Sequence, residues 1–381
     1  MNEALPLSLD VSAVPERPGG AGYYTMALCR GLAARPDVAL RLLGRRYDER
    51  RWAELGGEAA GVRPVVAASR PGRLVHEQVG FPSLLRSLGV RLHHGPHYTM
   101  PARSPVPCAV TIHDCTFFDH PEWHVRSKAA FFRRAIRRAA RAAGVLICVS
   151  EVTAQRLHDC VPVRAPVVVA PHGVDHARFS PEEPSEGADR DALAALALPE
   201  ETPLIVFVGT LEPRKGVAPL IEAFDLFAGR RRDARLVLGG QVGWGTAEVE
   251  RALASVRHAD RIVRTGYLSD SAVPALLRRA AVVAYPALEE GFGLPALEAL
   301  ACGAPLVTTR GTAMAEMAEG AALLVEPGSV TELAEALESA LGEGRTSARR
   351  DLGIRVAAAR TWEASLAEHV RAYDLAVAGP Q

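Results

Sequence analysis

Lysine is almost absent from this chain, and three other absences narrow the class of protein. Only Lys128 and Lys215 are lysine among 44 basic residues, so each of the two raises a functional question. No uncharged apolar run reaches the ~18 residues that a membrane-spanning helix needs. The opening MNEALPLSLDVSA lacks the basic start and apolar core of a secretory signal, so we expect none. The six cysteines form no C-x-x-C pair, which favours free thiols in the reducing cytoplasm over a zinc site or a disulfide framework.

Length and charge indicate two domains with different partners. A chain of 381 residues is too long for one compact core and suits two domains of ordinary size. The net charge is zero, but residues 1–180 hold 24 Lys or Arg against 15 Asp or Glu, and residues 181–381 hold 20 against 29. We therefore expect the first half to favour anionic partners and the two halves to attract each other.

Both halves alternate short apolar runs with helical patterns, which predicts an α/β protein with two parallel sheets. The segment SPEEPSEGAD is rich in Pro and Glu and poor in apolar residues, and predicts a linker. The expected parts are a first domain (1–180), a linker (181–190), a second domain (191–360) and a closing helix (361–381). We expect strands at Leu7–Val11, Leu40–Leu43, Ala109–Ile112, Val145–Val149, Val167–Ala170, Leu204–Val208, Leu236–Leu238, Ile262–Thr265, Val282–Ala284 and Leu306–Thr308, and helices near Tyr23–Ala34, Arg126–Arg141 and Ala218–Arg230.

The segment YPALEEGFGLPALEALACGAPLVTT, residues 285–309, is the most informative in the chain. It holds two carboxylates, Glu290 and Glu298, eight positions apart, with the turn Gly291-Phe292-Gly293 between them. Pro295 suits the first turn of a helix, and the residues after it are strong helix formers. The turn should aim backbone N–H groups and the positive end of the helix at one point, which suits a phosphate. Glu298, expected in the first helical turn, suits a ribose diol, and Glu290 suits the hydroxyls of a second sugar. Together they predict a nucleotide-sugar site.

Two adjacent cations follow the apolar run Leu204–Val208. Arg214 and Lys215 lie in VGTLEPRKG, just past the carboxyl end of the expected strand, where ligands bind to open α/β sheets. An arginine fork beside a lysine point charge would neutralise a diphosphate leaving group. The alternative is an exposed polar loop, and the scarcity of lysine favours the functional interpretation.

A glycine-rich loop follows the first expected strand. Gly19, Gly20 and Gly22 open the next helix and permit close approach of a phosphate or sugar. The pattern is not G-x-G-x-x-G, and no acidic residue follows at the end of a matching second strand, so a dinucleotide fingerprint is not met.

Three clusters imitate metal sites, and we expect none of them to bind a metal. His113 and Asp114 should end a strand and face a cleft, but their spacing to His120 and His124 fits no helical face. The same doubt applies to the histidines at 93, 94 and 97. Asp189 and Asp191 lie in the acidic linker with no strand before them, and we interpret them as solvated.

The helix RSKAAFFRRAIRRAAR, residues 126–141, is strongly basic. Such a helix can lie on an anionic membrane surface or meet a phosphorylated acceptor. The alternative, which base rates favour, is an ordinary exposed helix that packs on its apolar face.

With these motifs in place, the chain resembles glycosyltransferase family 4, a retaining group with the GT-B fold. The resemblance covers nearly the whole length, with the motifs in the expected order. They are GGAGYY (19–24), TIHD (111–114), HPEWH (120–124), CVSE (148–151), PHGVD (171–175), VGTLEPRKG (208–216), GYLSD (266–270), EEGFGLPALEALACGAPLV (289–307) and TWE (361–363).

The resemblance implies two Rossmann-like domains that face a central cleft, with the closing helix crossing back to the first domain. It implies that Arg214 and Lys215 hold the donor diphosphate and that Glu298 holds the ribose. Glu290 and the amides of Gly291, Phe292, Gly293 and Leu294 would hold the transferred sugar and phosphate. His113 would lie beside the anomeric carbon, Gly20 or Gly22 would approach the phosphates, and Gly209 and Tyr267 would line the donor site. No divalent metal or other cofactor is implied.

Among subgroups, LEPRKG with TIHD and HPEWH resembles bacterial mannosyltransferases that use GDP-mannose and build cell-envelope polysaccharides. The expected partners are a nucleotide sugar and a sugar or glycolipid acceptor, with peripheral contact at the inner membrane surface and no nucleic acid. Three alternatives stay open. They are a UDP-sugar-dependent transferase of the same family, a GT-B epimerase or phosphorylase, and an inactive donor-binding partner subunit.

Overall fold

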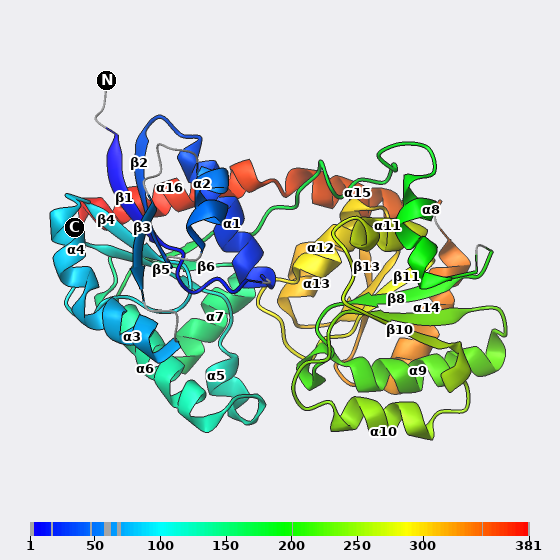
Figure 1. The fold of residues 1–381 in the computed structure, drawn as a ribbon. Helices are drawn as coiled ribbons and strands as arrows, with labels where there is room; N and C mark the ends of the chain where they lie inside the picture. Colours follow the sequence, from blue (N-terminus) through cyan, green and yellow to red (C-terminus); the bar gives the residue numbers. More distant parts are fainter. Residues whose placement is uncertain are drawn as a thin grey trace. The chain divides into compact units, whose positions relative to one another are not determined.

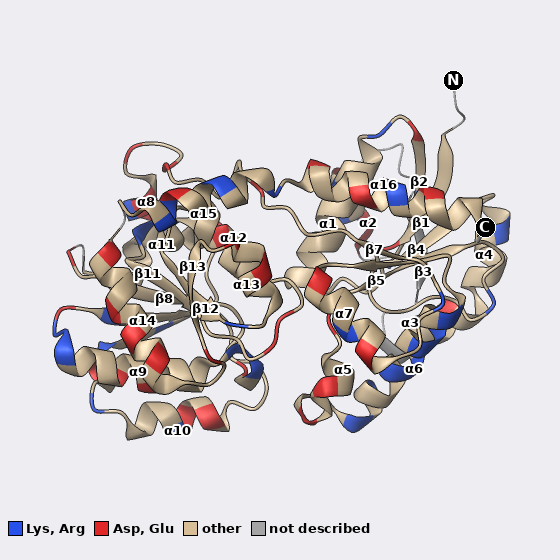
Figure 2. Ribbon diagram, turned by 180° about the vertical axis from the view of Figure 1, so that it is seen from behind, with Lys and Arg blue, Asp and Glu red and all other residues tan. Residues whose placement is uncertain are grey.

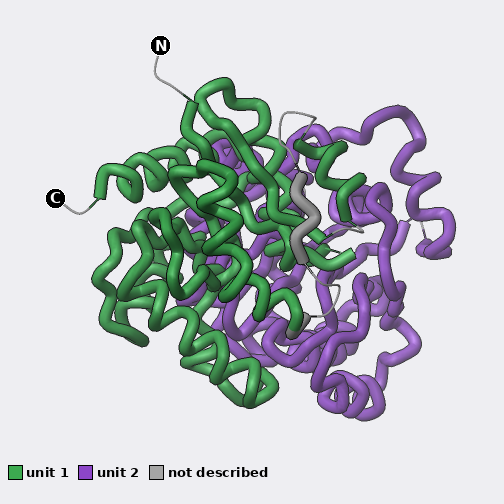
Figure 3. The backbone as a smooth tube through the Cα atoms, turned by 60° about the vertical axis from the view of Figure 1, so that its left-hand side comes forward, with its two compact units in different colours: residues 1–173, 362–381 green, residues 174–361 purple. Residues whose placement is uncertain are grey.

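The computed structural model describes residues 4–16, 18–45, 48–56, 62–66, 70–199, 201–344 and 346–379. The chain divides into two compact units (Figure 3). The first comprises residues 1–173 and 362–381, and the second comprises residues 174–361. The boundary lies before the expected linker, which belongs to the second unit. The expected linker belongs to the second unit because Asp189 forms an ion pair with the buried Arg278, with 2.6 Å between the two charged atoms. The acidic composition of the segment gave no sign of this partner. Our interpretation of Asp189 as solvated was wrong.

The first unit contains a seven-stranded parallel sheet with the order β3-β2-β1-β4-β5-β6-β7 (Figure 1). Its strands are β1 (Leu5–Asp10), β2 (Val38–Arg45), β3 (Val62–Val66), β4 (Leu92–Gly95), β5 (Cys108–Ile112), β6 (Val145–Cys148) and β7 (Val167–Val169). Its helices are α1 (Gly20–Ala33), α2 (Glu49–Gly56), α3 (Arg70–Val79), α4 (Phe81–Ser87), α5 (Thr116–Asp119), the 3₁₀ turn η3 (Pro121–Trp123), α6 (Arg126–Ala142), α7 (Glu151–Cys160) and α16 (Trp362–Ala378).

The second unit contains a six-stranded parallel sheet with the order β10-β9-β8-β11-β12-β13. Its strands are β8 (Leu204–Val208), β9 (Arg235–Gly239), β10 (Ile262–Gly266), β11 (Val282–Tyr285), β12 (Leu306–Thr309) and β13 (Ala322–Val325). Its helices are α8 (Ala188–Leu193), α9 (Val217–Arg230), α10 (Ala247–Ser255), α11 (Ala272–Arg279), α12 (Leu294–Ala301), α13 (Ala313–Ala318), α14 (Val330–Glu343) and α15 (Ala348–Ala359), with 3₁₀ turns η4 (Ala194–Leu196), η5 (Pro213–Lys215) and η6 (Ala259–Arg261).

The two sheets confirm the expected α/β class. In β5, β6, β8 and β11 nearly every residue is buried, as expected for parallel strands that helices cover on both faces. Short connections within each unit keep neighbouring β-α units in contact. None of the helices in the described ranges is long and apolar enough to cross a bilayer.

The strand β4 was missed because its sequence, LHHG, has neither β-branched residues nor alternation. Buried hydrogen bonds replace apolar packing there. His94 bonds to Thr111 and to Tyr373, each at 2.8 Å. Tyr24 bonds to Thr111 and to His369, again at 2.8 Å. This hydrogen-bond network links α16 to β4, β5 and α1. It also gives hydrogen-bond partners to buried polar side chains, whose burial without partners would destabilise the fold.

Candidate functional site

The strand order of the second unit reverses between β8 and β11, since β9 and β10 lie on one side of β8 and β11 to β13 lie on the other. Connections from such neighbours leave on opposite faces and open a crevice at the carboxyl edge, where ligands of open α/β sheets bind. The loops after these two strands and the helix α12 carry most of the candidate residues, namely Gly209, Arg214, Lys215, Glu290, Gly291, Phe292, Gly293, Leu294 and Glu298.

Lys215 is the centre of a charged cluster that joins these two loops. Its side chain is only 8% exposed, and its Nζ pairs with Glu290 and donates a 2.7 Å hydrogen bond to the Tyr285 hydroxyl. Arg214 donates to Glu212 at 2.6 Å, and its guanidinium lies 3.4 Å from the same Glu290 oxygen. Two cations thus converge on one carboxylate at the edge of the sheet.

The protonation of the cluster follows from its burial and its charges. Burial lowers the pKa of Lys215, although the Glu290 carboxylate opposes this shift. Burial alone would raise the pKa of Glu290, but Lys215 and Arg214 hold it below the ordinary value. Glu290 therefore keeps its negative charge at neutral pH and lies against the two cations.

The turn before α12 adds backbone donors. Gly293 has φ +93°, a conformation that an L side chain rarely adopts, and α12 begins at the next residue. The N–H groups of Ala296 and Leu297 donate to the Gly293 carbonyl. Within the described residues the N–H of Leu294 has no hydrogen-bond partner, and Pro295 has none to offer. The helix thus presents a positive end beside the cluster.

Replacing Gly293 by alanine should destabilise the second unit. A Cβ would lie 2.4 Å from Cγ of Met314, and the positive φ would be strained. We expect a loss of about 1–3 kcal/mol in the free energy of unfolding, measured by denaturant titration. The control is Gly342→Ala on α14, where a Cβ meets nothing within 4 Å. Gly342→Ala should be at least as stable as the parent, because alanine favours the helix more than glycine does. If Gly293→Ala also unfolded at no lower denaturant concentration than the parent, the strain at Gly293 would be refuted.

Glu298 lies just beyond the first helical turn in which we expected it, since it is the fifth residue of α12. Gly293 ends the preceding loop, so the helix starts at Leu294, one residue before Pro295. The proline alone did not determine this first residue of the helix. Burial raises the pKa of Glu298 to about 7, partly opposed by Arg178. A ligand that donates hydroxyl groups to this carboxylate would favour its charged form.

The first unit has its own reversal of strand order, between β1 and β4. A cavity of about 250 Å³ lies there, lined by the loop after β1, the start of α1 and His97. Gly20 and Gly22 are among its lining residues. A Cβ on Gly22 would lie 2.7 Å from Pro18, so a larger residue would distort the loop, whereas Gly20 has open space.

His113 follows β5 in the first unit. Its Nε2 lies 2.8 Å from the Pro96 carbonyl. Because a carbonyl only accepts, Nε2 carries the proton and Nδ1 keeps its lone pair. Burial lowers the pKa of His113, so the ring is neutral at pH 7. Tyr24, His97 and His172 surround it with ring centroids 5.2–6.1 Å away.

Sequence reasoning missed two members of the charged cluster. Tyr285 ends β11 and binds Lys215, and its place as the last polar residue of a buried strand was an available signal. Glu212 lies two residues before Arg214 and orients it.

Tyr267, which we expected in the donor site, lies apart from this cluster. It follows the edge strand β10, two strands from β8, and its side chain is 59% exposed.

In the part of the chain that the structure describes, no three His, Cys, Asp or Glu side chains are grouped to hold a metal ion. His93 bonds to Ser8 at 2.9 Å, and His94 belongs to the hydrogen-bond chain that fastens α16.

Two sequence families together match most of the chain. Residues 18–178 match the family described as Glycosyltransferase Family 4, and residues 189–356 match Glycosyl transferases group 1. The chain is similar to O-antigen chain mannosyltransferase B of Escherichia coli, with 26% identity over 293 residues that cover 76% of each chain.

Solved structures share the fold. Sucrose-phosphate synthase from Thermosynechococcus elongatus has a TM-score of 0.78 at 20% identity, over 98% of this chain and 99% of that one. HepE from Anabaena, solved in complex with UDP-glucose, has a TM-score of 0.73 at 18% identity, over 96% of this chain and 99% of that one. At these identities the likeness supports the two-domain GT-B fold.

Proposed function

Because the chain belongs to glycosyltransferase family 4 and is a hexose-transferring enzyme, we propose that it moves mannose from GDP-mannose to an acceptor hydroxyl with retention of the anomeric configuration. The acceptor is a glycan, a glycolipid or a small molecule. The observation that carries the proposal is the convergence of Arg214 and Lys215 on one anionic position where the strand order reverses.

The proposed chemistry is electrostatic. When the glycosidic bond of the donor breaks, negative charge develops on the leaving diphosphate. Arg214, Lys215 and the amino end of α12 stabilise that charge, and they are already held in place by Glu212, Tyr285 and Gly293. No step in this scheme needs a divalent metal, and we propose that the enzyme works without one.

The remaining candidate residues are proposed to bind the ribose, the transferred sugar and the phosphates of the donor. Glu298 accepts the ribose hydroxyls, and Glu290 turns to the hydroxyls of the transferred sugar once the diphosphate replaces it on Lys215. Gly209 and Tyr267 line the donor site. In the first unit, neutral His113 lies beside the anomeric carbon and Gly20 and Gly22 approach the phosphates.

Mannose is favoured by the relative named a mannosyltransferase. The alternative donor is a UDP-sugar, because HepE was solved with UDP-glucose. We propose that the enzyme works in the cytoplasm in cell-envelope polysaccharide biosynthesis, with peripheral contact at the inner face of the membrane.

A transfer assay tests the proposed reaction. The protein is incubated with GDP-mannose or UDP-glucose, a chelator and a set of mannoside and lipid-linked acceptors, and the products are identified by mass spectrometry. The proposal expects a hexosylated product from GDP-mannose. A product only from UDP-glucose would establish the alternative donor, and donor binding without any product would favour an inactive partner subunit.

Glu290→Gln should separate donor binding from transfer. It removes the charge that competes with a diphosphate for Lys215 and Arg214, so the affinity for a nucleoside diphosphate should rise about tenfold. Transfer should fall, because the sugar loses a charged partner. Titration calorimetry and the transfer assay measure the two effects. Glu335→Gln, the same change at an exposed position of α14, should alter neither, and weaker nucleotide binding by Glu290→Gln would contradict the displacement of Glu290.

A further inference from the structure

The helix α6 has a composition unlike that of any other helix in the described chain. Its 17 residues, RSKAAFFRRAIRRAARA, include seven cations and no carboxylate. Its inner side packs against the core of the first unit, and the buried residues there are Ala129, Phe132, Ile136, Ala139 and Ala140. Blue bands along the ribbon of α6 in Figure 2 mark its Lys and Arg residues.

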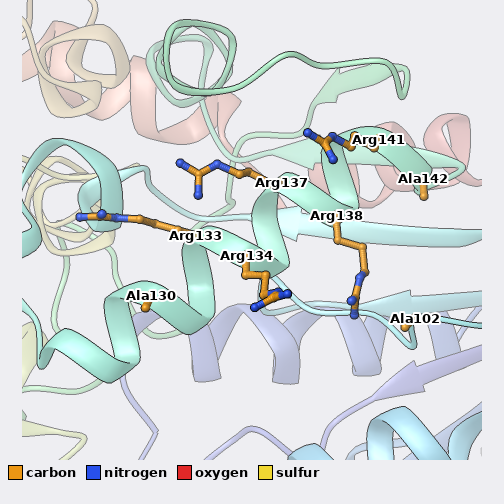
Figure 4. A pocket seen from close by; sticks show the side chains of 8 residues that line it. All are labelled: Ala102, Ala130, Arg133, Arg134, Arg137, Arg138, Arg141 and Ala142. Atoms are coloured by element: carbon orange, nitrogen blue, oxygen red, sulfur yellow. The ribbon is translucent and has the colours of Figure 1, made fainter.

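Five of these cations form an arginine row, which we define as Arg133, Arg134, Arg137, Arg138 and Arg141. The row lines an open hollow of about 740 Å³ together with three small residues (Figure 4). Arg133, Arg137 and Arg141 extend to one side of the helix and Arg134 and Arg138 to the other, so the side chains diverge (Figure 4).

No member of the arginine row has a carboxylate within 4.0 Å among the residues that the structure describes. Elsewhere, exposed arginines are commonly paired, as Arg230 is with Glu338 and Arg371 with Glu368. The contacts of the row are neutral. Arg133 donates to the Phe117 carbonyl at 2.6 Å, Arg138 donates to Gln78 at 3.4 Å, and Arg137 lies over the Phe118 ring at 5.1 Å. The charge of the row is therefore not neutralised within the protein.

The shape of the row selects among anionic partners. Arginines that bind one phosphate converge on it, whereas these diverge along a helix about 25 Å long. A partner that meets all five must present many separate negative charges over an extended surface. The apolar side of α6 is buried. Two large apolar side chains are exposed here, Phe131 at 37% and Val125, the residue before the helix, at 71%. Two isolated side chains do not form the continuous apolar face with which an amphipathic helix inserts into hydrocarbon.

We propose that the arginine row binds the anionic headgroups of a lipid bilayer by electrostatic adsorption, and that α6 is the element that carries peripheral contact with the membrane. Adsorption of this kind requires anionic lipid, weakens steeply with added salt and leaves no apolar anchor in the bilayer. The proposal does not depend on the identity of the donor sugar or acceptor.

The test is sedimentation of the full chain with lipid vesicles at low salt. One set is pure phosphatidylcholine, and the other contains about one third phosphatidylglycerol. The parent protein should bind only the anionic set and should be released by salt. The variant Arg134→Gln, Arg137→Gln and Arg141→Gln should lose about fivefold in partition for each arginine, hence about 100-fold.

The matched control is Arg232→Gln, Arg251→Gln and Arg257→Gln, which removes the same charge from exposed positions of the second unit. It should bind the anionic vesicles as the parent does. Circular dichroism and nucleoside diphosphate binding check that both variants are folded. If both triple variants lost vesicle binding equally, the binding would depend only on the net charge of the protein, and the assignment to α6 would be wrong. Equal binding of the parent to both vesicle sets would overturn the proposal altogether.

Discussion

Replacing Lys215 by alanine is expected to lower the transfer rate about 100-fold or more, by analogy with the loss of one donor that stabilises charge in a transition state. Lys215 is buried beside Tyr285 and Glu290, and no other lysine of the chain lies in the second unit. The loss removes a cation that a water molecule cannot replace. It is measured as the rate of product formation at saturating donor.

The control for this variant is Arg232→Ala, which removes an exposed cation of the same unit and should leave the rate unchanged. Arg214→Ala should also lower the rate, because its guanidinium approaches the same anionic position. Near-normal turnover in Lys215→Ala, with the protein folded, would remove Lys215 from the catalytic residues.

Mild acid is expected to unfold the first unit before the second. Burial lowers the pKa of His93 and His369 to about 4 and that of His97 to about 3, and it lowers the pKa of three further histidines. Those three are His94, His113 and His172. All six belong to the first unit. In the unfolded chain they take up protons near pH 6.5, whereas in the folded unit they stay neutral.

The sign follows from this difference in proton binding. The stability that the neutral histidines confer is present above about pH 6.5 and is lost as the pH falls toward 4, because only the unfolded chain gains protons there. The loss is about 1 kcal/mol for each of His93, His97 and His369 between about pH 7 and pH 5.5, and the other three histidines act in the same direction. Glu77 acts in the opposite direction, since burial raises its pKa to about 7 and its protonation returns about 1.5 kcal/mol.

The net loss is a substantial part of the stability of a typical domain, which is about 5–15 kcal/mol. The second unit lacks such a set of neutral histidines, and the raised pKa of Glu298 favours its folded state in mild acid. Hydrogen exchange by mass spectrometry, corrected for intrinsic rates, should show β4, β5 and α16 opening near pH 5.5 while β8 and β11 stay protected. Parallel loss of protection in both units would contradict the role of the histidines.

Much of the second-unit site could be predicted because its parts are local in the sequence. Lys215 follows an unambiguous buried strand, and Glu290, Gly293 and Pro295 lie within one short segment. The alternation of strands and helices then fixes the carboxyl edge where these loops meet. The pairing of Lys215 with Glu290 needed the strand order, which no local pattern supplies.

What could not be predicted depends on contacts between distant residues. The strand β4 has two histidines and becomes central only because Thr111 and Tyr373 satisfy them. The acidic segment that leads into α8 resembled a linker because Arg278, the partner of Asp189, lies about ninety residues away in the sequence. The helix α12 begins one residue before the proline because the left-handed Gly293 ends the loop there, and this start places Glu298 beyond the first turn.

The most direct test of the central claim is titration calorimetry with GDP, UDP, their monophosphates, GDP-mannose, UDP-glucose and UDP-N-acetylglucosamine, in the presence of a chelator. We expect one nucleoside series to bind, the diphosphate to bind more tightly than its monophosphate, and Lys215→Ala to remove this difference. Absence of binding by every one of these ligands, or equal affinity for the diphosphate and the monophosphate, would contradict a diphosphate site at Arg214 and Lys215.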